Sequence, residues 1–359
     1  MLSRMSLVYK TIVSAFNQRI APIFTGLGII ILHGIVSLGL ALDNLFFPSL
    51  RKKKIVAPIV IVGNPRSGTT FLQRFLVDNG FGAGMRIWKM LYPSLTIQTL
   101  VRPFLPLMEK VSPARFHNKA AHDTTLTGVE TDDPAFLFRF FDGFFLYGFF
   151  LAWAEEELKG LFEPENRDTS ERDFKWLNTM WRRNLVGEKS DRVTAKIFSL
   201  SMRIPRFLEF FPDAKILYLL RDPLETVPSG LSLVTGVLDK RFGFWSLPEE
   251  NRRRFIDRLY GAFLELNLRF HTDYMNGRIS KENLKLVHYT RIMGDFETLM
   301  DEIMEFVDFK PTPGFKKLLS ETAAKQKAYV SKHKYDLAKF GLDEEQIKKD
   351  YAVIYKDLM

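Results

Sequence analysis

A glycine-rich loop at residues 63–70, with the sequence GNPRSGTT, holds the residues best suited to bind an anion. Gly63 and Gly68 have the G-x-x-x-x-G spacing of phosphate-binding loops, in which backbone N–H groups and a helix N-terminus surround the anion. In nucleotide triphosphatases a lysine follows the second glycine, but this chain has Thr69 there. Because Arg66 can donate two parallel hydrogen bonds from inside the loop, the sequence predicts a site for a smaller anion than a triphosphate.

The segments on either side of this loop predict a strand and a helix. Residues 55–62, IVAPIVIV, are apolar and rich in β-branched side chains, which is typical of a strand buried in a parallel sheet. After the loop, apolar residues recur at helical spacing over residues 71–76, and the predicted helix ends near residues 79–80. This order places a helix N-terminus beside the predicted anion.

A second cationic residue follows a second predicted strand. Residues 214–220, AKILYLL, have the pattern of a buried strand. Arg221, Asp222 and Pro223 come directly after it, and Ser229 stands eight residues beyond Arg221. Asp222 and Pro223 suit the N-cap and the first position of a helix, so the sequence predicts another strand-to-helix connection here.

These two segments resemble a known family. GNPRSGTTFL is similar to the 5′-phosphosulfate-binding loop of sulfotransferases that use 3′-phosphoadenosine 5′-phosphosulfate (PAPS), whose common form is G-x-P-R/K-S-G-T-T-x-L. Residues 221–229 resemble the 3′-phosphate signature of that family, R-D/N-P after a strand with a serine further on. Looser similarity to its bacterial and broadly distributed branch covers residues 286–297 and 331–342. The resemblance implies an enzyme that transfers a sulfuryl group from PAPS to an acceptor hydroxyl.

The resemblance also implies roles for particular residues. Lys196, in a predicted strand at residues 193–198, corresponds to a lysine that contacts the transferring sulfuryl group. The cytosolic branch has a catalytic histidine two residues later, where this chain has Phe198. Arg221 and Ser229 are expected to hold the 3′-phosphate. The loop residues expected to hold the phosphosulfate are Asn64, Pro65, Arg66, Ser67, Gly68, Thr69 and Thr70.

The general base is open at this stage. Residues 128–134, GVETDDP, resemble an acidic segment that many non-cytosolic sulfotransferases carry between the two cofactor motifs. We favour Glu130 as the base, with His122, Asp132 and Asp133 as alternates, because a carboxylate can take the proton of an acceptor hydroxyl within hydrogen-bond reach. The alternative is that these acids are solvated and precede a helix that begins at the proline of this segment.

The fold class that the resemblance implies is α/β. We expect a three-layer, P-loop-NTPase-like parallel sheet flanked by helices, with an N-terminal membrane-associated helical segment. This segment is expected to cover residues 1–54, and the sulfotransferase domain residues 55–359. The alternatives are a non-catalytic PAPS-binding membrane protein and a P-loop nucleotide kinase, whose lysine is replaced here by Thr69.

The membrane prediction comes from an uncharged, largely apolar stretch of 23 residues, 20–42. Its length is enough to cross a hydrocarbon core of about 30 Å. An amphipathic pattern over residues 5–20 precedes it and a basic cluster at residues 51–54 follows it. We therefore predict a transmembrane or re-entrant anchor with the catalytic domain facing the cytoplasm, whereas a buried helix of a soluble protein is the alternative.

The charge distribution and the absence of cysteine exclude some classes of partner and cofactor. The net charge is +9, but seven basic residues and one acid within residues 1–54 account for six of these charges. The rest of the chain is nearly neutral and lacks the broad basic surface of a nucleic-acid-binding protein, so we expect no nucleic-acid partner. The chain has no cysteine, which excludes disulfides, thiolate catalysis and cysteine-bound metals, and we expect no metal cofactor.

Ten aromatic side chains lie close together in residues 136–153. A packed core helix is the favoured interpretation, because aromatic residues dominate protein cores. If these side chains instead line a binding site, they would suit a lipid or another membrane-associated alcohol as the acceptor.

Overall fold

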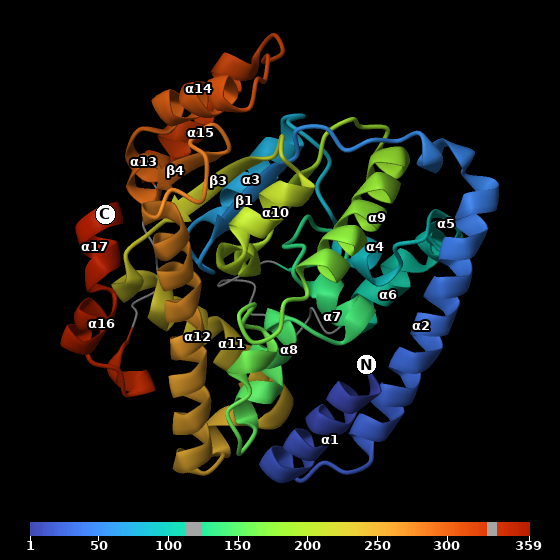
Figure 1. The fold of residues 1–359 in the computed structure, drawn as a ribbon, viewed down its shortest axis with the longest axis vertical. Helices are drawn as coiled ribbons and strands as arrows, with labels where there is room; N and C mark the ends of the chain where they lie inside the picture. The colour runs from blue at the N-terminus through green and yellow to red at the C-terminus, as the bar shows by residue number, and fades with distance from the viewer. Residues whose placement is uncertain (113–123, 329–335) are drawn as a thin grey trace. The chain divides into compact units, whose positions relative to one another are not determined.

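The described residues form a sheet of four parallel strands in the order β2-β1-β3-β4. Figure 1 labels β1, β3 and β4. The strands are β1 Ile59–Gly63, β2 Thr194–Lys196, β3 Lys215–Leu220 and β4 Leu284–His288. The predicted strands at residues 55–62, 193–198 and 214–220 are therefore confirmed, although the first begins four residues later than expected. Helices flank this sheet, as expected for an α/β fold whose parallel strands are buried on both faces.

The computed structural model describes residues 1–112, 124–328 and 336–359. The chain forms two compact units. Unit 1 comprises Met1–Ile55, Met85–Ser190 and Leu231–Ala262, and unit 2 comprises Val56–Gly84, Asp191–Gly230 and Phe263–Met359. The whole sheet lies in unit 2.

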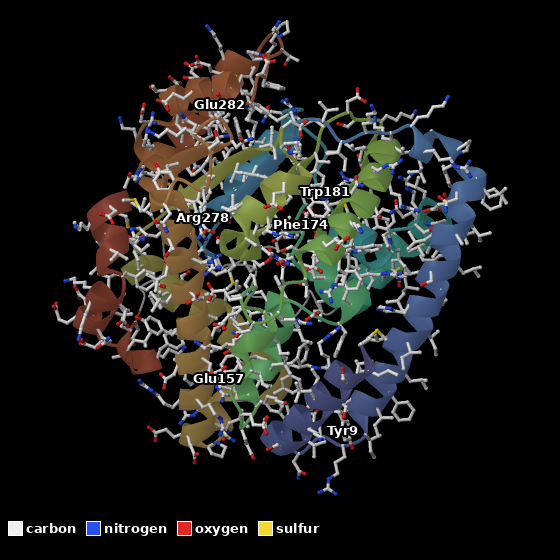
Figure 2. All side chains as sticks on the ribbon, viewed as in Figure 1. Tyr9, Glu157, Phe174, Trp181, Arg278 and Glu282 are labelled. Atoms are coloured by element: carbon white, nitrogen blue, oxygen red, sulfur yellow. The ribbon has the colours of Figure 1, made fainter. Side chains whose placement is uncertain are left out.

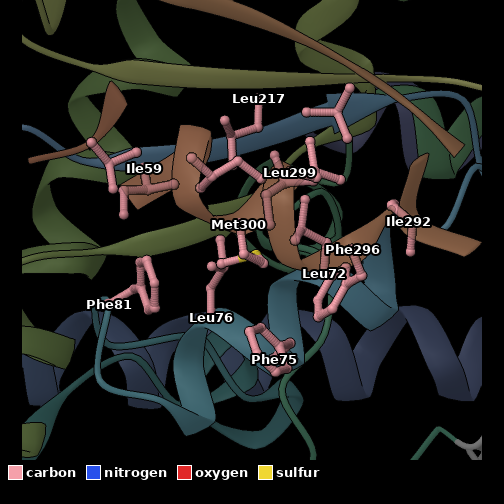
Figure 3. Close-up of a cluster of buried hydrophobic side chains, with 14 of the residues drawn as sticks. Ile59, Leu72, Phe75, Leu76, Phe81, Leu217, Ile292, Phe296, Leu299 and Met300 are labelled. Atoms are coloured by element: carbon pink, nitrogen blue, oxygen red, sulfur yellow. The ribbon is translucent and has the colours of Figure 1, made fainter. Parts of the chain in front are cut away.

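The two faces of the sheet pack against different side chains of unit 2. Successive side chains of a strand point to opposite faces, so Ile59 and Ile61 of β1 share one face. There they belong to a buried cluster with side chains of α3 Thr69–Asp78 and α14 Phe296–Phe306 (Figure 3). On β3, Tyr218 stacks on Phe270 with ring centroids 3.3 Å apart, and its hydroxyl donates to Asn267 Oδ1.

The other helices of unit 2 complete this packing. Helix α11 begins at Pro223, as the Asp-Pro sequence predicted. Unit 2 includes the first part of α11 Pro223–Phe242 and the last part of α12 Glu249–Met275. Its remaining helices are η6 Phe198–Met202, α10 Ile204–Phe210, α13 Tyr289–Gly294, α15 Phe315–Ala328, η8 Ala338–Phe340, α16 Glu344–Asp350 and α17 Ala352–Leu358.

Unit 1 is built from helices. The longer ones are α1 Leu2–Phe16, α2 Ala21–Phe46 and α9 Ser170–Glu188. The shorter ones are η1 Pro48–Arg51, α4 Ile87–Leu91, α5 Leu95–Val101, η2 Arg102–Phe104, α6 Leu105–Val111, α7 Pro134–Phe140, α8 Phe144–Phe149, η4 Leu151–Trp153, η5 Lys159–Leu161 and η7 Phe244–Ser246.

A buried carboxylate joins the N-terminal helix to the rest of unit 1. Asp142 accepts hydrogen bonds from Arg167 Nη2 at 2.6 Å and Arg172 Nη1 at 2.7 Å, and Arg4 Nη2 of α1 lies 3.6 Å away. Burial raises the pKa of Asp142, but the hydrogen bonds and charges of Arg167 and Arg172 outweigh it, so the net pKa is lowered. The carboxylate therefore stays ionised and paired.

The aromatic segment does not form the single helix that the sequence predicted. It forms α7, α8 and η4, with a turn at residues 141–143. In this turn Phe141 and Gly143 have positive φ angles, 50° and 88°. Asp142 lies between them and forms buried ion pairs with Arg167 and Arg172. Phe136, Tyr147 and other aromatic side chains of the segment are buried, as expected of a packed core.

Helix α2 confirms the predicted apolar helix and extends to Phe46. Among the described residues it is the one helix that is long and apolar enough to cross a membrane. It is largely exposed, with only Val36, Gly39 and Asp43 buried. The structure therefore does not support the alternative of a buried helix in a soluble core.

Candidate active site

The predicted site residues lie at the carboxyl ends of the strands or directly after them. Because all four strands are parallel, these ends lie at one edge of the sheet. The register pairs Gly63 with Leu219 and Leu220 with His288, so the glycine-rich loop, Arg221 and Tyr289 all begin at this edge. The chain leaves β1 toward β2 on one side and leaves β3 toward β4 on the other, which is where open α/β sheets form a crevice for ligands.

The loop backbone depends on two glycines. Gly63 has a φ angle of 131°, and a Cβ atom there would lie 2.5 Å from the carbonyl oxygen of Leu219. Gly68 has a φ angle of 89°, and α3 begins at the next residue, Thr69. Arg66 also has a positive φ angle, 74°, which is uncommon for a residue other than glycine and is typical of functional turns.

Two arginines and a serine of unit 2 contact one another at this loop. Arg66 Nε donates to Ser229 Oγ at 2.9 Å, and Arg221 Nη1 donates to the carbonyl oxygen of Arg66 at 2.9 Å. These residues come from the loop, from the end of β3 and from α11. The structure therefore brings together the two segments that the sequence singled out independently.

Lys196 also reaches the loop. Its Nζ donates to Thr70 Oγ1 at 2.8 Å, and its side chain is 3% exposed. Thr70 lies in the first turn of α3, whose N-terminus carries a partial positive charge. An ammonium group at this position adds to the positive potential of the loop.

Four further side chains hold this arrangement in place. The guanidinium of Arg221 lies over the ring of Tyr289 at 3.9 Å, and its Nε donates to Glu225 Oε2 at 2.7 Å. Asp222 Oδ1 accepts hydrogen bonds from the Leu224 backbone N–H at 2.9 Å and from the Tyr355 hydroxyl at 2.5 Å. Burial and then the Asp222 carboxylate raise the pKa of Tyr355, so this hydroxyl keeps its proton and remains a donor.

Sequence reasoning missed these supporting residues in different ways. Tyr289 belongs to the loosely similar segment at residues 286–297, but nothing local indicates that its ring stacks on Arg221. Glu225 lies in the first turn of α11, but Arg221 precedes that helix, so helical spacing did not predict their ion pair. No local sequence pattern predicts the role of Tyr355, because its contact with Asp222 spans 133 residues of sequence.

The acidic candidates for the general base belong to unit 1. Glu130, Asp132 and Asp133 are all buried, which differs from the solvated acids of the alternative interpretation. Trp181 Nε1 donates to Asp132 Oδ2 at 2.7 Å, and Thr131 Oγ1 donates to Asp133 Oδ2 at 2.5 Å. Asp133 does occupy the N-cap position of α7, but its side chain does not cap the helix.

Some predicted residues fall outside the described part of the chain. His122, an alternate base, lies in residues 113–123, and part of the similar segment at 331–342 lies in residues 329–335. Groups of metal-ligating side chains that could hold an ion do not occur within residues 1–112, 124–328 and 336–359.

The chain belongs to the sulfotransferase family, because the model of that family matches residues 58–313. This match covers both cofactor motifs and all four strands. Membership makes the chain a sulfotransferase family enzyme and implies PAPS as its co-substrate.

Solved structures of the same fold agree with this assignment. The crystal structure of sulfotransferase STF9 from Mycobacterium avium is similar with a TM-score of 0.66 and 17% identity, over 90% of this chain and 81% of that one. Sulfotransferase STF1 from Mycobacterium tuberculosis has a TM-score of 0.65 and 15% identity, over 98% and 90% of the two chains. At these identities the likeness concerns the fold. No curated protein sequence gave a significant match.

The close approach of β1 to β3 makes Gly63 a test of this architecture. We expect Gly63→Ala to lower the free energy of unfolding more than Gly80→Ala does. Gly80 also has a positive φ angle, 79°, but an added Cβ would meet no atom within 4 Å, so the loss there should be about 1–2 kcal/mol. Urea unfolding of both variants checks this; equal losses would show that the contact with Leu219 does not constrain the loop.

Proposed function

We propose that this enzyme transfers a sulfuryl group from PAPS to an acceptor hydroxyl, with the donor held at the carboxyl edge of the sheet. The observation that carries the proposal is the direct contact among Arg66, Ser229 and Arg221. The fold is proposed to be the three-layer, P-loop-NTPase-like form of the α/β class, in which such an edge binds nucleotides.

The hydrogen-bonding and cationic groups at this edge of the sheet fit an anionic nucleotide. The segment Asn64–Thr70 offers backbone N–H groups and the hydroxyls of Ser67, Thr69 and Thr70, and Arg66 adds a guanidinium. Arg221 and Ser229 add a second cationic group and a hydroxyl, which suits the separate 3′-phosphate of PAPS. Two guanidinium groups and an ammonium group match an anion with several charged oxygens better than they match a neutral ligand.

The residues of this chain act by position and charge. PAPS supplies the activated sulfuryl group. Lys196 stabilises negative charge that develops on the oxygens during transfer, and its hydrogen bond to Thr70 at the loop supports this role. Arg66 and the loop N–H groups orient the phosphosulfate end for an in-line approach.

Glu130 is our proposed acceptor of the hydroxyl proton. The choice rests on the resemblance of residues 128–134 to the acidic segment of other sulfotransferases and on the burial of Glu130, which is 4% exposed. A carboxylate can take the proton of an acceptor hydroxyl that lies within hydrogen-bond reach. Asp132 and Asp133 remain alternates, as does His122 outside the described residues.

We further propose a membrane-attached enzyme with a membrane-associated alcohol as its acceptor. Residues 1–54 would attach the chain and residues 55–359 would carry the transferase, on the cytoplasmic side. The exposed apolar helix α2 and the basic residues 51–54 support this division. An acceptor that resides in the bilayer would meet an enzyme bound to the same surface.

A ligand-binding measurement tests the proposed binding site for the sulfuryl donor PAPS, which we call the donor site. We expect 3′-phosphoadenosine 5′-phosphate to raise the melting temperature, because a ligand that binds only the folded state stabilises it by about 2.7 kcal/mol at a hundredfold excess over Kd. ATP lacks the 3′-phosphate and adds phosphates that the loop cannot neutralise, so it should give a much smaller shift. An equal shift with ATP would contradict the assignment of Arg221 and Ser229.

Two substitutions separate binding from chemistry. Arg221→Ala should weaken binding of 3′-phosphoadenosine 5′-phosphate about 10- to 100-fold, since a charged hydrogen bond contributes about 1.5–3 kcal/mol. Lys196→Ala should lower kcat about 100-fold or more with little change in that binding. Arg206→Ala, an exposed arginine of unit 2 paired with Glu209, is the matched control. If Lys196→Ala and Arg221→Ala had the same profile, their separate roles would be wrong.

Labelled PAPS tests the acceptor class. Incubation of the enzyme with PAPS that carries ³⁵S and with a membrane extract should place the label in the lipid fraction. The Lys196→Ala variant serves as the blank. Label that appears only in water-soluble products would reject a lipid acceptor while leaving the sulfotransferase assignment intact.

A further inference from the structure

The outer side of α2 is a long apolar surface. Its exposed residues include large hydrophobic side chains at 43–71% exposure, and Figure 2 shows side chains that project outward along this helix. Helix α5 packs against α2 and exposes Leu100. It continues into η2 and α6, which expose Phe104 and Leu107. The exposed large hydrophobic residues on and beside α2 are Ile20, Ile23, Phe24, Leu27, Ile30, Ile31, Ile35, Leu38, Leu45 and Phe46. We call these ten residues the outer face; monomeric proteins rarely leave so large a contiguous apolar surface to water.

The inner side of α2 is fixed to unit 1 by a buried ionic network. Asp43 is fully buried, and Arg183 Nε of α9 donates to its Oδ2 at 2.7 Å. Ser94 Oγ donates to Asp43 Oδ1 at 2.8 Å, and the backbone N–H and hydroxyl of Thr96 donate to the same oxygen at 2.9 and 2.8 Å. Breaking a buried pair of this kind is strongly destabilising because it leaves an uncompensated buried charge, so α2 does not detach readily.

Contacts continue along the same side of the helix. His33 Nε2 lies 2.8 Å from the carbonyl oxygen of Phe138, and Arg139 Nη1 donates to Ser37 Oγ at 3.2 Å. A Cβ atom at Gly39 would lie 2.3 Å from Ile97 Cδ1, so the helix packs closely on α5. From His33 to Asp43 the attached stretch is about 15 Å long at 1.5 Å per residue.

This attachment is incompatible with a membrane-spanning helix. A hydrocarbon core is about 30 Å thick, and the part of α2 before His33 is too short to cross it alone. If α2 crossed the bilayer as it stands, the Asp43–Arg183 pair and Arg139 would lie at or near the hydrocarbon, where a charged side chain is costly.

We propose that α2 lies in the plane of the membrane surface, with the outer face inserted into one leaflet that contains anionic lipids. Exposed basic residues stand at both ends of the helix, Arg19 before it and Arg51, Lys52 and Lys54 after it. Arg102 on η2 adds a further exposed cation beside α5. Cations around an inserted apolar face contact anionic head groups favourably.

The basic residues around the outer face favour an anionic bilayer over a second copy of the chain as the surface that covers it. A symmetric dimer through the outer face would bring the same basic residues of two chains together, whereas an anionic leaflet neutralises them. The proposal concerns attachment alone, so it is independent of the donor site and of the acceptor.

The absence of cysteine allows a direct test of topology. Single cysteines at Asn17→Cys and Ser49→Cys flank α2 at exposed positions, and Glu282→Cys marks an exposed position in unit 2. In sealed membrane vesicles a membrane-impermeant maleimide should label all three from the same side, with labelling after detergent as the control for reactivity. Labelling of Asn17→Cys and Ser49→Cys from opposite sides would show that α2 spans, and would overturn the proposal.

Vesicle binding tests the surface itself. The full chain should sediment with phosphatidylglycerol vesicles more than with phosphatidylcholine vesicles, and added salt should weaken the difference. The double variant Leu27→Glu/Ile31→Glu should bind at least tenfold less, while Val353→Glu, at another exposed apolar residue, should bind as the parent chain does. Unchanged vesicle binding by the double variant, or a parent chain that dimerises through α2 and ignores vesicles, would overturn the proposal. Binding of 3′-phosphoadenosine 5′-phosphate by each variant confirms that it is folded.

Discussion

The backbone contact between β1 and β3 at Gly63 is the constraint on which the donor site depends. Any side chain at this position would meet the carbonyl oxygen of Leu219 at 2.5 Å, so the two strands reach their present separation only with glycine here. That separation brings the end of β3 beside the loop, where Arg221 donates to the carbonyl oxygen of Arg66. The loop is therefore held by the same arginine that is proposed to bind the donor. Loop conformation and anion binding are coupled through one side chain.

The sequence predicted those parts of the site that local patterns determine. Apolar, β-branched runs predicted the buried strands. Gly63 and Lys196 are the last residues of β1 and β2, and Arg221 directly follows β3. The start of α11 at Pro223 follows from backbone preferences alone. Because the sheet is parallel, these residues share its carboxyl edge, as the register shows.

Contacts between residues far apart in the chain could not be predicted in this way. Stacking of Tyr289 on Arg221 and donation from Tyr355 to Asp222 depend on how later helices return to the sheet. The aromatic segment at residues 136–153 shows that contacts between distant residues can also override a local pattern. Its aromatic content favoured one packed core helix, but the segment forms three, with the buried pairing of Asp142 with Arg167 and Arg172 at the turn between the first two. An apolar pattern likewise identified α2, but it did not reveal the ion pair of Asp43 with Arg183.

The surroundings of Arg221 have a consequence for its replacement by lysine. The guanidinium is planar, and it stacks on Tyr289 while its separate N–H groups reach Glu225 and the carbonyl oxygen of Arg66. A lysine would preserve the positive charge, but an ammonium group is a compact point charge without a flat face or a forked set of donors. It could not satisfy the carbonyl oxygen and the carboxylate in the same geometry while covering the ring. An exchange that preserves charge would therefore loosen the turn at Arg66, and shape rather than charge restricts this position to arginine.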